Sequence, residues 1–196
     1  MEHTPAVADH VVTCDDAGNR TGTVPRADVH TTDTPLHLAF SCYLLDADDN
    51  LLVTRRALVK RTWPGVWTNS FCGHLRWTES VEDSLVRHAA HELGGRVTDI
   101  DVALPEFRYR AVDASGVVEN EICPVYVARV VGDVEPNPDE VAEEAWSPAR
   151  DVLTAVRATP WAFSPWMVEQ VEALAAVPPA DRTPGARTLA DALGLR

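Results

Sequence analysis

Alternating apolar and polar residues predict that the middle of the chain is built mainly from β-strands. HLAFSCYLL (His37–Leu45) is apolar and rich in strand-forming residues, and LLVTRR (Leu51–Arg56) resumes that pattern after the turn cluster DADDN (Asp46–Asn50). Together these segments predict a β-hairpin. Two further strands are predicted over Leu104–Val112 and Val117–Val131.

Helices are predicted between and after these strands. Apolar residues recur every four positions between Thr78, the expected N-cap, and the stop signal Gly94-Gly95. Proline suits the first turn of a helix, so two more helices are expected to begin at Pro148 and Pro165.

This order of elements predicts an α+β fold in a single domain. Strands dominate the middle, and helices are interleaved with them and follow them, which favours a mixed α/β/α arrangement over a regular βαβ series. A chain of 196 residues, 45% of them hydrophobic, is large enough to bury one core. We place that core at residues 36–147, with N-terminal and C-terminal additions. The Pro-, Ala- and Arg-rich tail over residues 178–196 is expected to be loosely held and unimportant for chemistry.

The net charge of −13 limits the partners that the protein is expected to bind. Long-range repulsion opposes a general affinity for nucleic acid or for an anionic membrane. A small anionic substrate would therefore need a local group of cations or metal ions to hold it.

Cysteine usage and the N-terminal segment favour a soluble, cytoplasmic protein. The four cysteines (Cys14, Cys42, Cys72 and Cys123) are widely spaced and form no C-x-x-C pair, so we expect reduced thiols instead of disulfides or a cysteine zinc site. The N-terminal stretch MEHTPAVADHVVTCDD lacks the apolar core of a signal peptide, and no apolar run is long enough to span a bilayer. We expect a monomer.

The first predicted helix carries part of a Nudix box. In that motif a helix presents carboxylates to a metal ion that bridges diphosphate oxygens. At two positions where a Nudix hydrolase has further glutamates for metal binding and water activation, this chain has His88 and His91, which favours a scaffold that holds a diphosphate without cleaving it. For Glu82 and Asp83 we favour a solvated helix face, whereas the motif register favours a ligand role for Glu92. The residues at the motif's intervals are Gly73, Glu79, Arg87, Glu92 and Gly94.

A second candidate site lies in the strand VENEICPVYV. Residues two apart in a strand point to the same side, so Glu119 and Glu121 converge while Asn120 points away. Adjacent carboxylates repel each other unless a cation or a shared proton intervenes. Acidic pairs are common on exposed sheets, but the apolar residues Ile122 and Val125–Val127 indicate a central strand, where an unpaired acidic pair is costly.

The element TNSFCGHL provides a third candidate site. Cys72 and His74 flank Gly73, which allows the chain to approach a ligand closely. A lone cysteine is usually a small buried hydrophobe, and we interpret Cys42 and Cys123 in that way. Cys72 differs because a histidine and the start of the Nudix-like helix adjoin it.

Two histidines and a basic cluster complete the candidates. His30 and His37 are of the residue type that most often binds transition metals, but alone they specify little without a third ligand. The segment RRALVKR contains Arg55, Arg56, Lys60 and Arg61. It is either a basic loop that balances acidic neighbours or a clamp on phosphate oxygens.

Taken together, these segments resemble the type I isopentenyl-diphosphate isomerases. The similarity runs from about Thr21 to Met167, and the order of the tryptophan-rich loop, the C-G-H element and the E-N-E strand is highly specific. The matching stretches are HLAFSCYLL, LLVTRRALVKRTWPGVWTNSFCGH, the ELG end of the helix, FRYRAVDASGVVENEICPV and TPWAFSPWM.

The resemblance implies two metal sites. The first would hold Mn²⁺, Zn²⁺ or Mg²⁺, because nitrogen and oxygen ligands suit each of these ions. The second would hold Mg²⁺, which bridges the diphosphate and is bound by Glu92 and the backbone of Cys72. The implied ligands of the first metal are His30, His37, His74, Glu119 and Glu121.

The resemblance also implies roles in catalysis and substrate binding. Cys72 and Glu121 correspond to the family's proton-transfer pair, Tyr109 to an active-site tyrosine and Trp166 to an aromatic wall of the pocket. At His88 the family often has an arginine, so the diphosphate contact there is expected to be weaker or to rely on Arg87. The residues expected to hold the diphosphate are Arg26, Arg56, Lys60, Arg87 and His88.

The implied reaction is the interconversion of isopentenyl diphosphate and dimethylallyl diphosphate through a tertiary carbocation-like species. One rival interpretation is a Nudix-type diphosphate hydrolase. The histidines at two glutamate positions of the Nudix box argue against it. The other is a non-catalytic metal-binding or ligand-sensing module that keeps the pocket without turnover.

Overall fold

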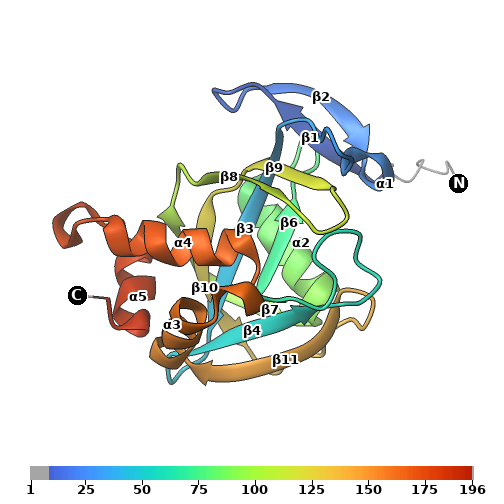
Figure 1. The fold of residues 1–196 in the computed structure, drawn as a ribbon. Helices are drawn as coiled ribbons and strands as arrows, with labels where there is room; N and C mark the ends of the chain where they lie inside the picture. Colours follow the sequence, from blue (N-terminus) through green and yellow to red (C-terminus); the bar gives the residue numbers. More distant parts are fainter. Residues whose placement is uncertain (1–8, 196) are drawn as a thin grey trace, which may run out of the picture.

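Strand β3 (His37–Leu45) is the central strand of the protein in a computed structural model that describes residues 9–195 (Figure 1). It pairs in parallel with β10 (Val125–Val131) and, through its first two residues, with β9 (Val118–Ile122). It pairs in antiparallel fashion with β6 (Phe71–His74) and with β4 (Asn50–Arg56). The predicted hairpin is therefore confirmed, although β3 and β4 share only the register pair Leu45 and Leu51 before they diverge.

The remaining strands extend the sheet outward from these neighbours. β1 and β2 form an antiparallel hairpin that joins the start of β3, while β7 pairs with β10 and β8 with β9. β5 and β11 both pair with β4. Their bounds are β1 His10–Cys14, β2 Arg20–Pro25, β5 Trp67–Thr68, β7 Arg96–Leu104, β8 Arg108–Val112 and β11 Val141–Pro148.

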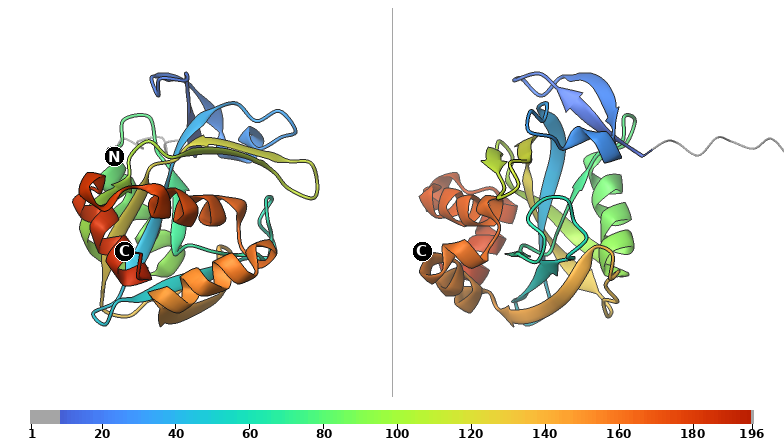
Figure 2. Two further views of the ribbon diagram at one scale, coloured as in Figure 1. Left: turned by 60° about the vertical axis from the view of Figure 1, so that its left-hand side comes forward. Right: turned by 45° about the vertical axis from the view of Figure 1, so that its right-hand side comes forward.

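Helices cover both faces of the sheet. α2 (Val81–Leu93) lies on one face, and α3 (Ala149–Ala158), α4 (Pro165–Ala176) and α5 (Pro184–Leu193) lie on the other (Figure 2). A short α1 (Arg26–Val29) follows the β1–β2 hairpin, and 3₁₀ turns precede α4 and α5. The predicted mixed α/β/α arrangement is confirmed.

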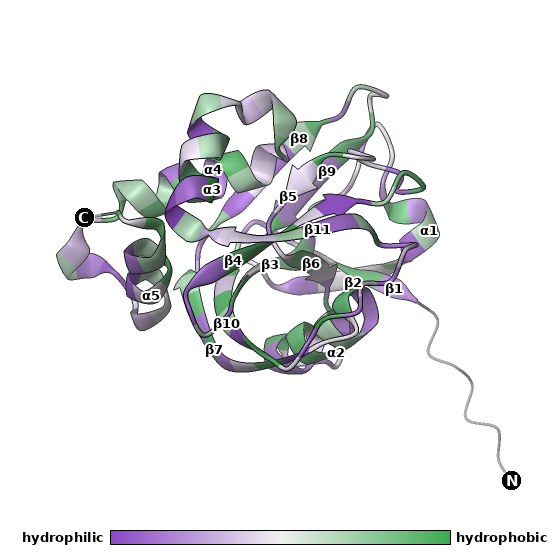
Figure 3. Ribbon diagram, turned by 90° about the horizontal axis from the view of Figure 1, so that it is seen from below, coloured by the Kyte–Doolittle hydropathy of each residue, from purple (hydrophilic) through white to green (hydrophobic). Residues whose placement is uncertain are grey.

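The period-two pattern of β3 explains why helices pack on both of its faces. Phe40 and Cys42 belong to the apolar cluster under α2, whereas Tyr43 and Leu45 belong to the cluster under α3–α5. Alternate side chains of a strand point to opposite faces, so a strand that is apolar at nearly every position must be covered twice. Figure 3 shows the strands lying between α2 and the C-terminal helices.

Several predicted boundaries differ from the structure. Ser80 caps α2 in place of Thr78, because its hydroxyl accepts a hydrogen bond from the backbone N–H of Asp83 at 3.1 Å. The predicted strand from Leu104 is interrupted by a turn, so that Leu104 ends β7 and a separate β8 follows. The predicted strand over 117–131 is likewise two strands, β9 and β10, with a break before Val125.

The tail expected to be loosely held is instead packed against the sheet. Leu189 and Leu193 of α5 are buried in the cluster under the C-terminal helices. Thr183 caps this helix and donates a hydrogen bond to the carbonyl of Val102 in β7 at 2.6 Å. A Cβ at Gly185 would lie 2.6 Å from that same carbonyl oxygen, so only glycine allows so close an approach. The Pro- and Ala-rich composition concealed this amphipathic helix.

The N-terminal segment also differs from expectation. The sequence predicted only that it is not a signal peptide, but it contains the strand β1. Residues 1–8 of that segment lie outside the described residues. Across residues 9–195, no helix combines the length and the apolarity needed to cross a bilayer.

One ion pair ties α2 to the loop that precedes it. Arg87 donates hydrogen bonds to both carboxylate oxygens of Glu79 at 2.7 Å, and also to the backbone carbonyl of His74 at 3.0 Å. The hydrogen bonds from Arg87 are the main reason why the pKa of Glu79 falls to about 2. The spacing of Glu79 and Arg87 noticed in the sequence therefore anchors the helix to the end of β6.

Leu193→Ala should destabilise the protein by about 2–5 kcal/mol, because it leaves a cavity under α5. The free energy of unfolding, measured by urea titration, checks this expectation. As a control, Asp191→Ala removes an exposed side chain of the same helix and should change stability by no more than about 0.5 kcal/mol. Equal effects of the two substitutions would contradict the packing described here.

Glu79→Gln should flatten the pH dependence of stability in acid. The folded pKa of Glu79 is about 2, below its ordinary value of 4.5, so the ion pair contributes fully above about pH 4.5 and is lost as the pH falls toward 2. The contribution at neutral pH is on the order of 1 kcal/mol, because the pair is partly exposed. Melting temperatures between pH 7 and 2 measure it. Glu82→Gln, at an exposed position of the same helix, should keep the wild-type profile.

Candidate active site

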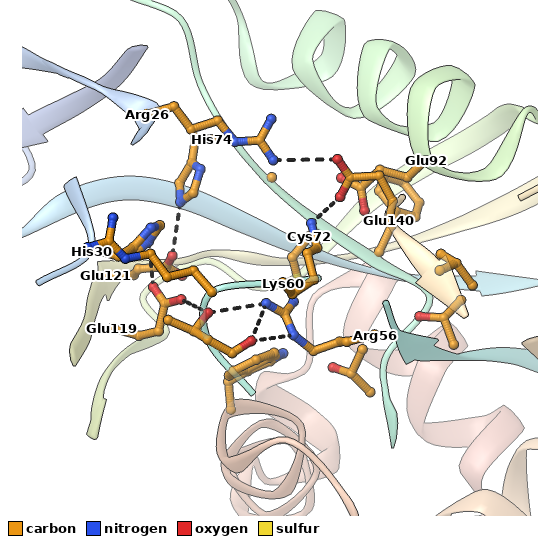
Figure 4. A pocket seen from close by; sticks show the side chains of 18 of the residues that line it. Arg26, His30, Arg56, Lys60, Cys72, His74, Glu92, Glu119, Glu121 and Glu140 are labelled. Carbon is orange, nitrogen blue, oxygen red and sulfur yellow. Dashed lines mark hydrogen bonds and ion pairs between the residues drawn. The ribbon is translucent and has the colours of Figure 1, made fainter. Parts of the chain in front are cut away.

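A cavity of about 520 Å³ opens where the β1–β2 hairpin, the loop after β4 and the strands β6 and β9 meet. Most residues predicted to act in metal binding, catalysis or substrate binding line it, although they come from distant parts of the sequence. His30, Glu119 and Glu121 lie at one end of the cavity and Glu92 and Glu140 at the other (Figure 4). The predicted site residues among its lining are Arg26, His30, Arg56, Lys60, Cys72, His74, Glu92, Tyr109, Glu119, Glu121 and Trp166.

Strand pairing brings the histidines and glutamates together. His37 is paired with Glu121 across the parallel contact between β3 and β9, and His74 at the end of β6 is paired with Ala39 of β3. Both glutamates of β9 are buried, at 5% and 6% exposure, while Asn120 turns away and donates a hydrogen bond to the carbonyl of Thr34. The alternation expected for this strand is what the structure shows.

Three imidazoles and one carboxylate converge within this cluster. One ligand atom from each of His30, His37, His74 and Glu121 lies within 4.8 Å of all the others. Oε1 of Glu121 lies 3.2 Å from Nε2 of His74 and 3.3 Å from Nε2 of His37. Glu119 adjoins the group, with its Oε2 2.9 Å from Nε2 of His30. The five predicted ligands of the first metal are therefore neighbours.

The hydrogen bonding of this cluster fits a divalent cation. His37 is fully buried, and its Nδ1 lies 2.8 Å from the carbonyl oxygen of Pro35, to which only an Nδ1–H can donate. In the neutral ring the lone pair of Nε2 then faces the cluster. Within residues 9–195, Nε2 of His30, Nε2 of His37 and Oε2 of Glu119 find no hydrogen-bond partner although they are buried. Buried polar atoms without partners are costly, and a cation bound between them would satisfy all three.

The titration behaviour of His74 and Glu121 agrees with that assignment, whereas for His37 burial lowers the pKa but the interactions with Glu121 outweigh it and raise that pKa. Burial, together with repulsion from the other two imidazoles, lowers the pKa of His74 to about 4, so this ring is neutral and keeps a lone pair for a metal. Burial alone would raise the pKa of Glu121, but its interactions with His37 and His74 hold that pKa well below the usual range. A neutral imidazole and an ionised carboxylate are the protonation states that metal binding needs.

The thiol of Cys72 lines the same cavity and forms hydrogen bonds with two buried side chains that do not line it. Its Sγ is 3.3 Å from the hydroxyl of Ser41 and 3.3 Å from the side-chain nitrogen of Asn69. Burial raises the pKa of this thiol to about 12, against these hydrogen bonds, which favour the thiolate. Cys72 therefore carries its proton at neutral pH.

Aromatic rings form the wall beside the thiol. The centroid of the buried Trp166 ring lies 5.4 Å from that of Trp63, in an edge-on arrangement, and 5.7 Å from that of Tyr109. The guanidinium carbon of Arg56 lies 5.2 Å from the centre of the Trp166 ring, within cation–π range. Burial raises the pKa of Tyr109 well above its usual value, so its phenol stays protonated. The face of Trp166 thus already accommodates positive charge.

The basic side chains gather around Glu140. This carboxylate forms an ion pair with Lys60, and its Oε1 lies 3.8 Å from Arg26 and 3.5 Å from His91. Burial opposes its ionisation, but Lys60, Arg26 and His91 together lower its pKa. Arg56 instead donates two hydrogen bonds to the carbonyl of Thr62, which orders the loop after β4.

Arg87 and His88, both predicted to hold the diphosphate, do not face the cavity. Arg87 is committed to Glu79 and to the backbone of His74. His88 is buried, donates or accepts a hydrogen bond at 2.8 Å with Glu92, and packs so closely on Gly73 that a Cβ there would lie 2.4 Å from its ring. The structure therefore argues against direct substrate contacts for these two residues. Both instead contact β6, which carries Cys72, from α2, which carries Glu92.

Several residues of the site were not identified from the sequence. Asn69 and Ser41, which contact the thiol, and Thr62, which donates a hydrogen bond to Glu119 at 2.7 Å, are of types that occur throughout the chain. Asn69 lies in the recognised TNSFCGH element, which was the only available signal. Glu140, in the loop before β11, carried no signal, because one acidic residue among many in an acidic chain is inconspicuous.

Comparisons with known proteins agree with this geometry. The family model described as NUDIX domain matches residues 35–167. The isopentenyl-diphosphate Delta-isomerase of Agromyces mediolanus is 56% identical over 167 residues, which cover 85% of this chain and 81% of that protein. The protein of the same name from Leifsonia xyli subsp. xyli is 55% identical over 168 residues, which cover 85% and 91%.

A solved structure supports the fold alone. The crystal structure of DR0079 from Deinococcus radiodurans superposes with a TM-score of 0.65 at 16% sequence identity, and the match covers 84% of this chain and 98% of that one. Because the domain match spans more than half of the chain, and relatives of one name are more than half identical to it over most of its length, the chain belongs to the isopentenyl-diphosphate Delta-isomerase family and is built on a NUDIX domain.

Proposed function

We propose that this protein interconverts isopentenyl diphosphate and dimethylallyl diphosphate. The observation that carries the proposal is that the thiol of Cys72 and the buried carboxylate of Glu121 line one cavity, with three imidazoles gathered around the carboxylate. The names and the high identity of the relatives support the same reaction. We further propose that the protein acts as a monomer.

The two ends of the cavity suit the two ends of such a substrate. Arg26, Arg56 and Lys60 supply positive charge for the diphosphate, and arginine adds the fork geometry that matches phosphate oxygens. A bound diphosphate would replace Glu140 as the ion-pair partner of Lys60 and Arg26. Glu92 and the backbone carbonyl of Cys72 would hold a Mg²⁺ ion that neutralises the diphosphate oxygens.

The thiol and the carboxylate would then exchange two protons with the five-carbon chain. One proton is added to the terminal carbon of the double bond, which leaves a tertiary cation-like centre at the next carbon. A proton is then lost from the carbon on the other side of that centre, and the double bond re-forms there. The substrate gains one proton and loses one, and the proton left on the accepting group returns to the donating group before the next turnover, so no other reactant is consumed. Positioned acid–base groups contribute on the order of 10² to 10⁴ in rate.

The surroundings of the thiol would protect the cation-like centre. The π face of Trp166 stabilises positive charge by about 2 kcal/mol or more when water is excluded. Tyr109, whose phenol remains protonated, lies beside that ring and near the proton-exchanging groups. An aromatic, largely dry wall also keeps water from capturing the cation.

The cluster of three histidines and two glutamates would hold the first metal ion, which we assign to Mn²⁺, Zn²⁺ or Mg²⁺. When bound, that ion supplies a fixed positive charge beside the carboxyl group of Glu121. The residues of the cluster orient this carboxyl group toward the cavity, and Thr62 fixes its neighbour Glu119.

An isomerase assay tests the proposal directly. Purified protein with Mg²⁺, and with Mn²⁺ or Zn²⁺ added after chelation, should convert isopentenyl diphosphate into dimethylallyl diphosphate, as followed by NMR or chromatography. Release of phosphate or pyrophosphate alone would favour a Nudix-type hydrolase. Metal binding without either product would favour a non-catalytic module.

Cys72→Ala should lower kcat by about 10² to 10⁴ while the protein still binds metal at the histidine cluster. The reason is that the substitution removes a proton-exchanging group but none of the imidazole or carboxylate ligands. Rates and metal content should be measured on the same preparation. Full activity in Cys72→Ala would refute the acid–base role while leaving the reaction itself in place.

Lys60→Ala should raise KM about tenfold or more, because it removes a point charge from the proposed diphosphate site. The metal content of the histidine cluster should not change. As a matched control, Arg55→Gln removes one positive charge from the same segment, but Arg55 pairs with Glu143 and does not line the cavity, so KM should stay within about twofold. Loss of metal from Lys60→Ala would show instead that the basic cluster is structural.

A further inference from the structure

A buried polar layer lies directly behind the thiol and the aromatic wall. Asn69, Ser41 and Gln170 are at most 1% exposed, yet each forms several side-chain hydrogen bonds. Gln170 of α4 donates to the hydroxyl of Ser41 at 2.8 Å and accepts from the phenol of Tyr43 at 2.9 Å. Such a layer is costly unless every group is satisfied, which makes its geometry well defined.

Asn69 is the centre of this layer. Its Oδ1 accepts hydrogen bonds from the indole Nε1–H of Trp166 at 3.0 Å and from the hydroxyl of Thr68 at 2.9 Å. Its Nδ2 donates to the backbone carbonyls of Cys42 at 3.1 Å and Phe71 at 2.9 Å. The amide group therefore connects β3, the start of β6 and α4.

These partners fix which way the amide of Asn69 points. The indole N–H of Trp166 can only donate, so it must face an oxygen, and the two backbone carbonyls can only accept, so they must face the nitrogen. Rotating the amide by half a turn would set its nitrogen against the indole N–H and its oxygen against both carbonyl oxygens. Buried donors that face donors and acceptors that face acceptors are costly, so a single orientation is strongly preferred.

The same fixed amide contacts the thiol of Cys72. The Sγ atom lies 3.3 Å from Nδ2 and 3.4 Å from Oδ1 of Asn69, and the hydroxyl of Ser41 lies 3.3 Å away on another side. The thiol and the indole of Trp166 are thus held by one side chain, which itself cannot turn.

We propose that Asn69 is the positioning residue that sets the Cys72 thiol and the Trp166 ring relative to each other. The proposal rests on the function proposed above, in which the thiol exchanges a proton and the ring faces the resulting positive charge. Both groups must meet neighbouring carbons of a small substrate, so their mutual position matters more than the position of either alone. Displacement of reacting groups by about 1 Å can cost on the order of 10²-fold in rate.

Asn69→Ala should therefore lower kcat by about 10- to 100-fold while KM changes by no more than about threefold. The split is expected because, within the part of the chain that the structure describes, Asn69 does not line the cavity and forms no hydrogen bond with the basic side chains proposed to hold the diphosphate. Steady-state kinetics at saturating metal measure both constants.

Ser70→Ala is the matched control. Ser70 is the next residue, is equally buried, and forms two hydrogen bonds of similar length, from the N–H of Leu44 at 2.7 Å and to the carbonyl of Leu52 at 2.6 Å. None of its hydrogen bonds reaches the thiol or the indole. It should lower stability but leave kcat within about threefold. An equal loss of kcat in Ser70→Ala and Asn69→Ala would overturn the proposal.

A double-mutant cycle with Trp166→Phe isolates the coupling. Phenylalanine keeps a ring but cannot donate to Asn69, so the loss caused by Asn69→Ala should shrink by at least about threefold in this background. If Asn69→Ala costs the same factor in both backgrounds, Asn69 does not act through Trp166, and the proposal fails.

A measurement that needs no turnover completes the test. In protein labelled with ¹⁵N-tryptophan, the indole N–H of Trp166, identified by its absence in Trp166→Phe, should exchange with solvent far more slowly than that of Trp161, which is 83% exposed. It should also shift in Asn69→Ala but not in Ser70→Ala. Fast exchange in the wild type would overturn the proposal even if Asn69→Ala did not fold. A wild-type protein without isomerase activity would refute the proposed function, while these spectra would still decide whether Asn69 holds the ring.

Discussion

The pairing of β3 with both β6 and β9 is the constraint on which the site depends. It sets His37 opposite Glu121 and places His74 next to Ala39, so three polar ligands meet in a part of the sheet that is otherwise apolar. A cluster of this kind would be strongly destabilising without a cation, because lone pairs and charges are buried facing one another. The apolar clusters on both faces of the sheet offset that cost and leave the cluster no room to relax.

The same pairing explains why the thiol lies where it does. Cys72 and His74 are two apart on β6, so both face the cavity, while Gly73 between them turns toward α2 and receives the ring of His88. α2 is in turn anchored by Arg87, which reaches back to Glu79 and to the carbonyl of His74. The Nudix-like helix thereby fixes the strand that carries the thiol as well as its own Glu92.

What could be predicted from the sequence follows periodicity and local motifs. The alternation in VENEI correctly placed Glu119 and Glu121 on one side, and the proline signals correctly located the starts of α3 and α4. These signals could not show which strands are neighbours. β9 and β10 both pair with β3, and only a short break at Cys123 and Pro124 separates them along the chain.

The misses have physical causes of the same kind. α5 was predicted to be a loose tail because its small residues and prolines obscure a narrow apolar face. That face packs against β7, which the sequence does not show. Arg87 was read as a substrate contact because a sequence shows that a residue is cationic but not which carboxylate has already paired with it. Asn69 could not be singled out, since its importance depends on an indole 97 residues away.

The distribution of carboxylates indicates why this scaffold favours chemistry on carbon over cleavage of a diphosphate. Hydrolysis needs several carboxylates near phosphorus to bind metal and activate water. Among the described residues of α2, only Glu92 lines the cavity, and the buried ring of His88 fills the space beside it. Glu140 is close by, but it lies in the loop before β11 and not on α2, and without a ligand it pairs with Lys60 and Arg26.

The other two cavity carboxylates, Glu119 and Glu121, lie on β9 together with the histidines. Thr62 connects the two ends, because its carbonyl accepts from Arg56 and its hydroxyl donates to Glu119. The carboxylates that lie beside the imidazoles of the histidine cluster are thus gathered on β9, whereas the described residues of α2 contribute Glu92 alone to the cavity, and this distribution suits a fixed charge beside Glu121 better than water activation at phosphorus.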